Sequence, residues 1–433
     1  MRHLMQFVFV AASGAAGLWS HPSAAAPSEP APGDASTCAS LAEAIARSHP
    51  ALRAARARAS AAVERSSAEG SLPPPMASFE IWDFPIGAPS RADSEGMYMF
   101  GLTQEFPGDG RGDRARAETE MAHEARAEGE DVARRLRADA AHACVDWAIA
   151  ESVRIPLLEH RRLLEQMREA AVVAYRGSAG ALGAVARADA ELASAERRIA
   201  EVEADLETAR DSLAAFAGSD VKLPPSAPAL LDRGANPESA QLTAVALAAR
   251  GDVSAAKARQ SAAAAKLDAV ETEASTPSFE VRATYMQTPG MRPGLGAMLG
   301  MSLPWLWGGG GDRKDGARHE FEAAAADAEV TRRMARVEVA RAAGRVRALR
   351  RSLAVLRERE IPAAERAIEA ERAMLGSAGF ELSEWIQAAT ALRAARVDEA
   401  RMRGEIEHAF VDLEASVGRT LEQVEPPRAG RRP

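Results

Sequence analysis

Apolar positions recur with a helical period over most of this chain. From about residue 113 to 175, and again from 312 to 375, the sequence reads as uninterrupted helix, which at 1.5 Å per residue predicts two helices of ~95 Å. Pro156 and Pro362 fall inside them and predict kinks or local breaks. Apolar residues spaced 3 and 4 apart form seams typical of coiled coils: Ile199, Val202, Leu206, Ala209, Leu213 and Phe216, and Val346, Leu349, Leu353 and Leu356.

The same tetrapeptide, Gly-Ser-Ala-Gly, follows each predicted long helix, at 177–180 and again at 376–379. Paired glycines supply the φ > 0 positions that a helix needs in order to stop and reverse. The chain therefore predicts two helical hairpins with tips at about 177–184 and 376–383. The tip glycines are Gly177, Gly180, Gly376 and Gly379.

The pattern changes to strand-like alternation in four runs, at about 77–84, 97–106, 278–287 and 295–306. Ten of the 17 aromatic residues that follow residue 26 lie in the windows 77–107 and 278–307 that hold these runs. Strands of ~10 residues with aromatic residues near their ends are typical of membrane-spanning β-barrels. A pair of ordinary soluble hairpins is the alternative.

The remaining segments complete a duplicated layout. A helix at about 41–71 opens the first repeat (40–220), and a helix at about 238–275 opens the second (238–422). A Pro-rich linker at 221–237 joins the two repeats, and a Pro- and Arg-rich tail at 423–433 is expected to be disordered. The repeats are offset by about 200 residues.

The first 26 residues resemble a secretory signal peptide, with a short basic start, an apolar stretch and small residues at 23–26. Residues 27–39 are interpreted as a flexible lead-in. The two cysteines, Cys38 and Cys144, indicate neither a disulfide framework nor a metal-ligand spacing. Whether Cys38 carries a lipid is left open.

Composition excludes several function classes. The net charge is −8 and no basic cluster is present, so nucleic-acid binding has no support. Residues 308–311, four glycines, lack the Lys-Ser/Thr ending of a phosphate loop, and no catalytic arrangement or cofactor motif is present. The histidines show no paired-ligand spacing, and His123, His142 and His160 are expected to face solvent. Seven methionines lie near the strands, and thioethers can bind Cu(I). Packing or lipid contact explains these methionines better than metal binding does. We predict a protein that is not an enzyme.

The strands and the helices both require an assembly. Only helices and closed barrels can span a bilayer, because lipid leaves an open sheet edge without hydrogen-bond partners. Four strands cannot close a barrel that has an interior. A coiled-coil hairpin of ~95 Å likewise cannot bury its seam alone. Both arguments predict an oligomer in which the strands form one barrel and the helices form a long tube.

This layout resembles the outer-membrane factor family, the TolC-like efflux and secretion ducts. Residues 44–46 and 49–52 look like the family's opening helix motif, and residues 101–107 (Gly-Leu-Thr-Gln-Glu-Phe-Pro) look like the strand that leads into its long helix. Residues 175–192 and 375–392 look like its two tips. The resemblance covers nearly all of residues 40–420.

The resemblance implies a mainly α-helical homotrimer with a 12-stranded β-barrel in outer-membrane lipid and a helical tunnel in the periplasm. Its partners would be a periplasmic adaptor protein and, through it, an inner-membrane pump. Residues 104–107, before a Gly- and Arg-rich linker, look closest to relatives that serve heavy-metal cation pumps. A soluble or peripheral coiled-coil scaffold is the alternative function, and a closed family member with a structural role is a second alternative.

The tips hold the candidate functional residues. Many relatives carry Asp where this chain has Ala184 in the first tip, whereas Glu384 occupies the corresponding acidic place in the second. Glu381 and Glu384, repeated around a threefold axis, would form a cation-favouring ring at the entrance. The simpler interpretation is that both are solvated residues at a helix start. The tip glycines would dock the adaptor, or would only permit the turn.

Overall fold

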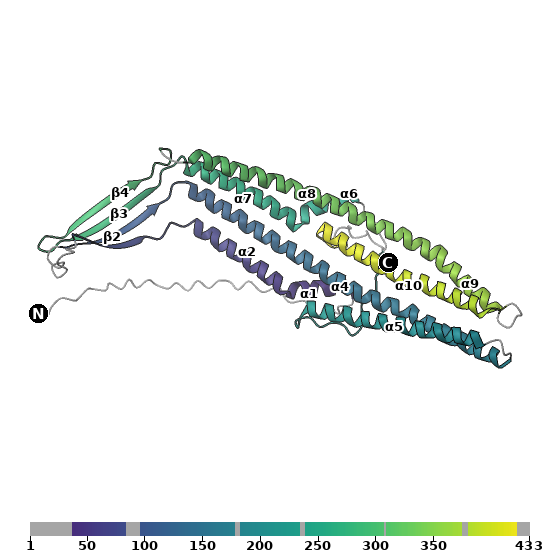
Figure 1. The fold of residues 1–433 in the computed structure, drawn as a ribbon. Helices are drawn as coiled ribbons and strands as arrows, with labels where there is room; N and C mark the ends of the chain where they lie inside the picture. The colour runs from purple at the N-terminus through teal and green to yellow at the C-terminus, as the bar shows by residue number, and fades with distance from the viewer. Residues whose placement is uncertain are drawn as a thin grey trace, which may run out of the picture. The chain divides into compact units, whose positions relative to one another are not determined.

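The computed structural model describes residues 37–83, 96–177, 182–233, 239–306, 309–374 and 380–421. All of them belong to one compact unit, Ser36–Pro433. The first part of this unit runs through α1 (Cys38–Ser48), α2 (Pro50–Glu69), β1 (Met76–Trp82), β2 (Met97–Phe106), α4 (Gly110–Gly177) and α5 (Leu182–Ala217) (Figure 1). The second part runs through α6 (Ser239–Ala249), α7 (Gly251–Glu273), β3 (Phe279–Gln287), β4 (Gly294–Met301), α8 (Gly310–Val355), the π-helical turn η3 (Leu356–Glu360), α9 (Ile361–Ala373) and α10 (Leu382–Val417). The predicted signal peptide lies outside the described residues.

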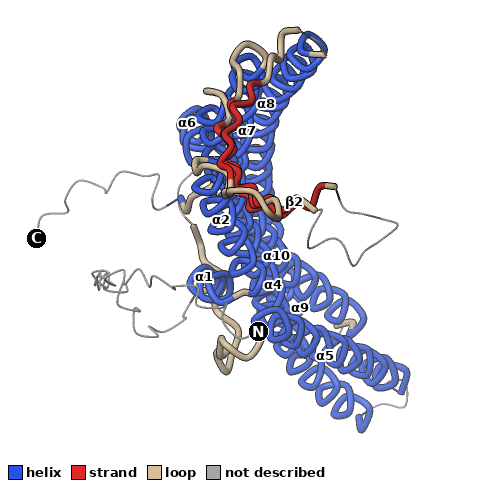
Figure 2. Tube along the Cα trace, turned by 90° about the vertical axis from the view of Figure 1, so that its left-hand side faces the viewer, coloured by secondary structure: helices blue, strands red, loops and turns tan. Residues whose placement is uncertain are grey.

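The strands form one antiparallel sheet in the order β1-β2-β3-β4, at the end of the helices that faces the viewer in Figure 2. Phe79 pairs with Phe100, and Phe100 pairs with Tyr285, so the register aligns aromatic residues across three strands. The predicted strand 295–306 is too long: β4 ends at Met301, and residues 304–306 form a turn. Pro304 has no N–H with which to continue a ladder.

The two opening helices are each broken in two, contrary to the prediction of single helices at 41–71 and 238–275. His49 is extended (φ −61°, ψ 134°) because a proline follows it, and Pro50 then starts α2. The Nδ1 of His49 accepts a hydrogen bond from the Ala51 N–H at 3.2 Å. Arg250 is extended in the same way (φ −75°, ψ 130°) between α6 and α7, although no proline follows it.

The long helices tolerate their prolines differently. α4 spans 68 residues and continues through Pro156 without the break that the sequence predicts. Val153 and Leu157 beside it are buried against α5 and α10, so packing holds the helix where one backbone hydrogen bond is lost. Before Pro362 the helix widens into η3, which is the predicted local break.

The predicted seams are buried between helices. Ile199, Val202 and Leu213 of α5 are buried, and Val346, Leu353 and Leu356 are buried in the second half. One hydrophobic cluster packs α8, α6 and α10 around Phe410 and Leu413. None of the described helices has a stretch that is both long and apolar enough to cross a lipid bilayer.

A disulfide joins Cys38 of α1 to Cys144 of α4, across 106 positions of sequence. The interpretation that the cysteines form no disulfide was therefore wrong. Their spacing carries no motif, and only the packing of α1 on α4 brings the two sulfurs together. In the part of the chain that the structure describes, no cysteine is free.

Gly251 allows α7 to approach α4 closely. A Cβ at this position would lie 2.5 Å from the carbonyl oxygen of Ala127 and 2.8 Å from the amide nitrogen of Asp131. Because both are backbone atoms, Gly251→Ala should separate the helices and lower the free energy of unfolding by about 1–3 kcal/mol. Urea unfolding of the purified full chain measures the effect.

Gly344 is the control, because it lies inside α8 and a Cβ there meets nothing within 4 Å, whereas Gly251 is the first residue of α7. Gly344→Ala should be neutral or should stabilise by up to about 1 kcal/mol, since glycine has low helix propensity. Equal unfolding midpoints for the two variants would contradict the close-packing explanation.

Candidate gate at the hairpin tips

The candidate tip glycines are only partly covered by the structure. Gly177 is the last residue of α4. Gly180, Gly376 and Gly379 lie outside the described residues. Their role in docking an adaptor therefore stays a prediction. The described residues that flank the turns are the ends of α4 and α9 and the starts of α5 and α10.

Glu381 and Glu384 lie together at the start of α10. Glu381 is the N-cap residue, with an extended backbone (φ −115°, ψ 115°), and its side chain makes no capping hydrogen bond. Its carbonyl oxygen accepts a hydrogen bond from the Glu384 N–H at 3.1 Å. Both side chains are exposed, and the Oγ of Ser383 lies 3.5 Å from Oε2 of Glu381. The structure thus places both glutamates at the exposed start of α10.

A buried aromatic base fixes this turn. Trp385 and Ile386 pack with Leu164 and Met167 of α4 and Ala195 of α5. Phe380 meets Trp385 edge-on, with ring centroids 5.9 Å apart. Because the residues immediately after Glu384 are anchored to the other hairpin, the position of the two carboxylates is tied to α4 and α5. Sequence reasoning missed Trp385, although an isolated Trp inside an Ala-rich helix could have indicated a packing anchor.

His160 of α4 lies in the interior of this half of the molecule, contrary to the expectation that it faces solvent. Burial, followed by the positive charges of Arg393 and Arg198, lowers the pKa of His160 from 6.5 to about 4. Between these two values the folded chain binds fewer protons here than the unfolded chain does. Its contribution to stability therefore falls as the pH drops from about 6.5 to about 4.

The sheet presents two unlike faces. Residues opposite each other in an antiparallel register share a face, so one face carries Phe79, Ile81, Phe100, Leu102, Phe106, Phe279, Val281, Tyr285, Leu295 and Leu299. These large apolar side chains are exposed, Leu295 to 86% and Leu299 to 71%. The opposite face carries Glu80, Thr103, Glu280 and Arg282, and Arg282 donates to Thr103 Oγ1 at 3.1 Å and to Glu280 at 3.3 Å.

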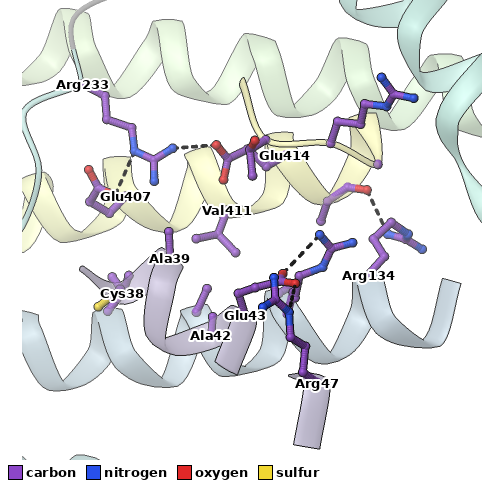
Figure 3. A pocket seen from close by; sticks show the side chains of 18 residues that line it. Cys38, Ala39, Ala42, Glu43, Arg47, Arg134, Arg233, Glu407, Val411 and Glu414 are labelled. Carbon is purple, nitrogen blue, oxygen red and sulfur yellow. Dashed lines mark hydrogen bonds and ion pairs between the residues drawn. The ribbon is translucent and has the colours of Figure 1, made fainter. Parts of the chain in front are cut away.

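A cavity of about 290 Å³ lies between α1, α4 and α10 beside Cys38 (Figure 3). Arg233 reaches into it from the linker and contacts Glu407 at 3.3 Å and Glu414 at 2.8 Å. Burial raises the pKa of Glu407 against the opposing effect of Arg233. These contacts attach the linker between the two halves to α10, and Figure 3 shows the guanidinium of Arg233 between the two carboxylates.

Within the described ranges, no group of three or more His, Cys, Asp or Glu side chains is arranged to hold a metal ion. The candidate site is thus a pair of exposed carboxylates on a rigid base. In one chain such a pair attracts cations and also interacts favourably with the N-terminus of α10. The geometry of a single chain therefore agrees both with a cation-favouring ring at the entrance and with two solvated residues at a helix start.

Comparison with known proteins supports a single structural class. Residues 242–419 match the family described as outer membrane efflux protein. A search of curated proteins gives no match. Among solved structures, the chain is similar to CusC (TM-score 0.75, 16% identity, 88% of this chain and 92% of that chain). It is also similar to VceC from Vibrio cholerae, with a TM-score of 0.73 and 18% identity over 88% of this chain and 96% of that chain. The similarity to MtrE from Neisseria gonorrhoeae in its open state has a TM-score of 0.71 and 17% identity over 89% of this chain and 90% of that chain. At these identities the similarities show the fold.

Proposed function

We propose, from the match of residues 242–419 to the family described as outer membrane efflux protein, that the chain is the outer-membrane duct of an efflux system. The duct conducts its substrate passively, from a periplasmic adaptor and an inner-membrane pump to the exterior. The helices line a tunnel in the periplasm, and the sheet lies in the outer membrane.

The observation that carries this proposal is the two-faced sheet. Its apolar face is uncovered in the described part of the chain, whereas a soluble sheet buries such a face against other elements. Its other face carries a polar cluster, in which Arg282 bonds to Thr103 and Glu280, beside the apolar residues Met76, Trp82 and Met298. Apolar residues outward and polar residues inward are the pattern of a barrel wall between lipid and water.

The sheet edges and α8 support a homotrimer. β1 and β4 are the edges of the four-stranded sheet, and an open edge has no hydrogen-bond partners in lipid. Three copies would close a 12-stranded barrel. On α8, Val330, Met334 and Val337 form an exposed apolar stripe with spacing of 4 and 3, which suits a coiled-coil contact with a neighbouring chain.

The mass of the protein extracted from outer-membrane fractions in mild detergent tests this proposal. Light scattering corrected for detergent should give three chains, and the same preparation should produce ion-conducting steps in a planar bilayer. A soluble monomer or dimer would instead favour the coiled-coil scaffold. A trimer that never conducts would favour the closed, structural family member.

The gate is tested in the same recordings. Neutralising Glu381 and Glu384 together, as Glu381→Gln with Glu384→Gln, should reduce the cation-over-anion permeability ratio by roughly 2- to 10-fold, because the entrance loses two carboxylates from each chain. Glu405→Gln is the matched control, since Glu405 is an exposed glutamate of the same helix far from the tip. An unchanged ratio in the double variant would leave both residues as solvated helix-start residues.

The cargo proposed for the duct is heavy-metal cations. This finer assignment rests on the resemblance of residues 104–107 and of the Gly- and Arg-rich linker after them to relatives of that branch. In the structure these residues end β2 and lead into α4. Cation-selective conductance that depends on the tip carboxylates would agree with the assignment, and anion selectivity would contradict it.

A further inference from the structure

Two copies of one short pattern face each other across α4 and α10. Residues 142–146 are His-Ala-Cys-Val-Asp, and residues 408–412 are His-Ala-Phe-Val-Asp. A histidine and an aspartate four positions apart lie on one face of a helix. The two helices run antiparallel, because His142 meets Asp412 and Asp146 meets His408. The expectation that His142 faces solvent was therefore wrong.

The four side chains form a continuous row. His142 Nε2 lies 3.0 Å from Asp412 Oδ1, and His408 Nε2 lies 2.9 Å from Asp146 Oδ1. Between them, the Nδ1 atoms of the two histidines are 2.7 Å apart. The two imidazole planes are inclined by 24° and their centroids are 4.9 Å apart, so the rings meet edge to edge through these nitrogens. The row therefore contains three short polar contacts between α4 and α10.

Counting protons determines when this row can exist. Each of the three contacts needs one proton, because two lone pairs or two N–H groups facing each other at this distance repel. With both aspartates ionised and both histidines neutral, the row holds only two protons. With both histidines charged it holds four. One imidazolium and one neutral imidazole supply three protons and satisfy every contact.

The charges around the row favour that state. Asp146 of α4 and Asp412 of α10 flank the two rings, and Arg345 of α8 lies 3.9 Å from the second oxygen of Asp412. The hydrogen bond from His142 outweighs partial burial and lowers the pKa of Asp412, so this carboxylate stays ionised. The side chain of Asp146 is 61% exposed, so solvent can exchange protons with the row.

We propose that His142 and His408 hold one shared, exchangeable proton and thereby form a pH-sensitive clamp between α4 and α10. The clamp links the long helix of the first hairpin to the returning helix of the second. It closes when the pair carries one proton and opens when that proton leaves or a second one arrives. The inference does not depend on channel activity.

The direction of the pH effect follows from proton linkage. Free imidazole titrates near pH 6.5, so above that pH the two unfolded histidines carry no extra proton while the clamp carries one. Stability from the clamp then falls as the pH rises. Below that pH the unfolded histidines carry two extra protons and the clamp carries one, so stability falls as the pH drops. The pH dependence of stability above pH 6.5 reports on the clamp without a contribution from His160, because His160 changes protonation only at lower pH.

The test compares the wild type with His142→Gln by urea unfolding of the full chain in detergent at one protein concentration, from pH 6.5 to 9. The unfolding equilibrium constant of the wild type, relative to the variant, should rise by up to about tenfold per pH unit per chain over part of this range. His123→Gln is the matched control, because His123 lies on the same helix, is 53% exposed and has its Nδ1 3.6 Å from Glu120 of its own helix. This control should keep the wild-type pH profile.

A second variant separates the clamp from simple loss of packing. Asp146→Asn keeps an oxygen that can accept from His408 but removes the charge that favours the imidazolium. Its loss of stability should therefore begin at lower pH than in the wild type. Parallel profiles for the wild type, His142→Gln and Asp146→Asn would overturn the proposal. Stoichiometric stabilisation by Zn²⁺ that replaces the pH dependence would also overturn it, in favour of a metal site.

Discussion

Replacing Cys144 with serine is expected to lower the free energy of unfolding by about 4–5 kcal/mol, the largest effect that we predict for a single side chain. The bond to Cys38 closes a loop across 106 positions, and cross-linking a loop of this size restricts the unfolded chain by about that amount. It also holds α1, an 11-residue helix, against α4. Urea unfolding under non-reducing conditions measures the loss.

The comparison of three variants is the internal control. Cys38→Ser and Cys144→Ser should each cost as much as the double substitution, because either one removes the same bond. A reductant should destabilise the wild type and leave the variants unchanged. If the double variant costs the sum of the single ones, packing of the sulfurs rather than the cross-link explains the effect.

The disulfide also bears on lipid attachment. Lipidation of a cysteine uses the same sulfur atom that Cys38 shares with Cys144. The mass of the non-reduced peptide that contains Cys38 should therefore correspond to the cross-linked pair without a lipid. A lipid-modified Cys38 beside a free Cys144 thiol would contradict this expectation.

Replacing Arg250 with alanine should cost about 3–5 kcal/mol, the typical result of removing one partner from a buried ion pair. The Arg250 side chain is 3% exposed and lies at the break between α6 and α7. It forms a bidentate pair with Asp252 at 2.9 and 2.6 Å and bonds to Glu338 of α8 at 2.6 Å. It also donates to the carbonyl oxygen of Ser416 at 3.0 Å, near the end of α10. The substitution would leave these acceptors without their donor.

Arg259→Ala is the matched control, because Arg259 of α7 pairs with Glu124 and Glu128 of α4 while remaining half exposed. An exposed pair contributes at most about 1 kcal/mol, so the control should change the unfolding midpoint little. Arg250→Lys keeps the charge but cannot form the bidentate pair. Its loss of stability should therefore lie between the losses in Arg250→Ala and Arg259→Ala. Equal losses in Arg250→Ala and Arg259→Ala would contradict the role given to burial.

The Arg250 cluster also contributes to acid sensitivity. Burial is the largest single effect and opposes ionisation of Asp252, but the hydrogen bonds and charge of Arg250, the charge of Arg134 and the Val253 N–H together outweigh it, so the pKa of Asp252 is lowered from 3.8. A carboxyl group whose pKa is lowered by folding stabilises the fold at pH values above its pKa in the unfolded chain. That stability is lost as the pH falls through its pKa in the folded chain. Arg250→Ala should therefore lose this part of the acid dependence below about pH 4.

What the sequence alone determined is what depends on short periods along the chain. The spacing of 3 and 4 predicted the seams around Val202 and Val346, and the burial of both residues confirms it. Strand-like runs and their return about 200 positions later located the four strands, although β4 ends at Met301. The single helix predicted at 41–71 was wrong, because Pro50 imposes a break at His49. Helix caps, strand faces and proline effects act within a few residues, and so they appear in the local pattern.

What only the tertiary structure decided is which faces meet. The Cys38–Cys144 bond, the pairing of His142 with His408 and the burial of His160 join segments that no periodic signal relates. Arg250 breaks a helix without a proline, because its side chain is held by Glu338 and Ser416 from other helices. Long helices in contact have many possible registers with similar apolar seams. The polar and sulfur contacts that depend on one register become visible only when the helices are packed.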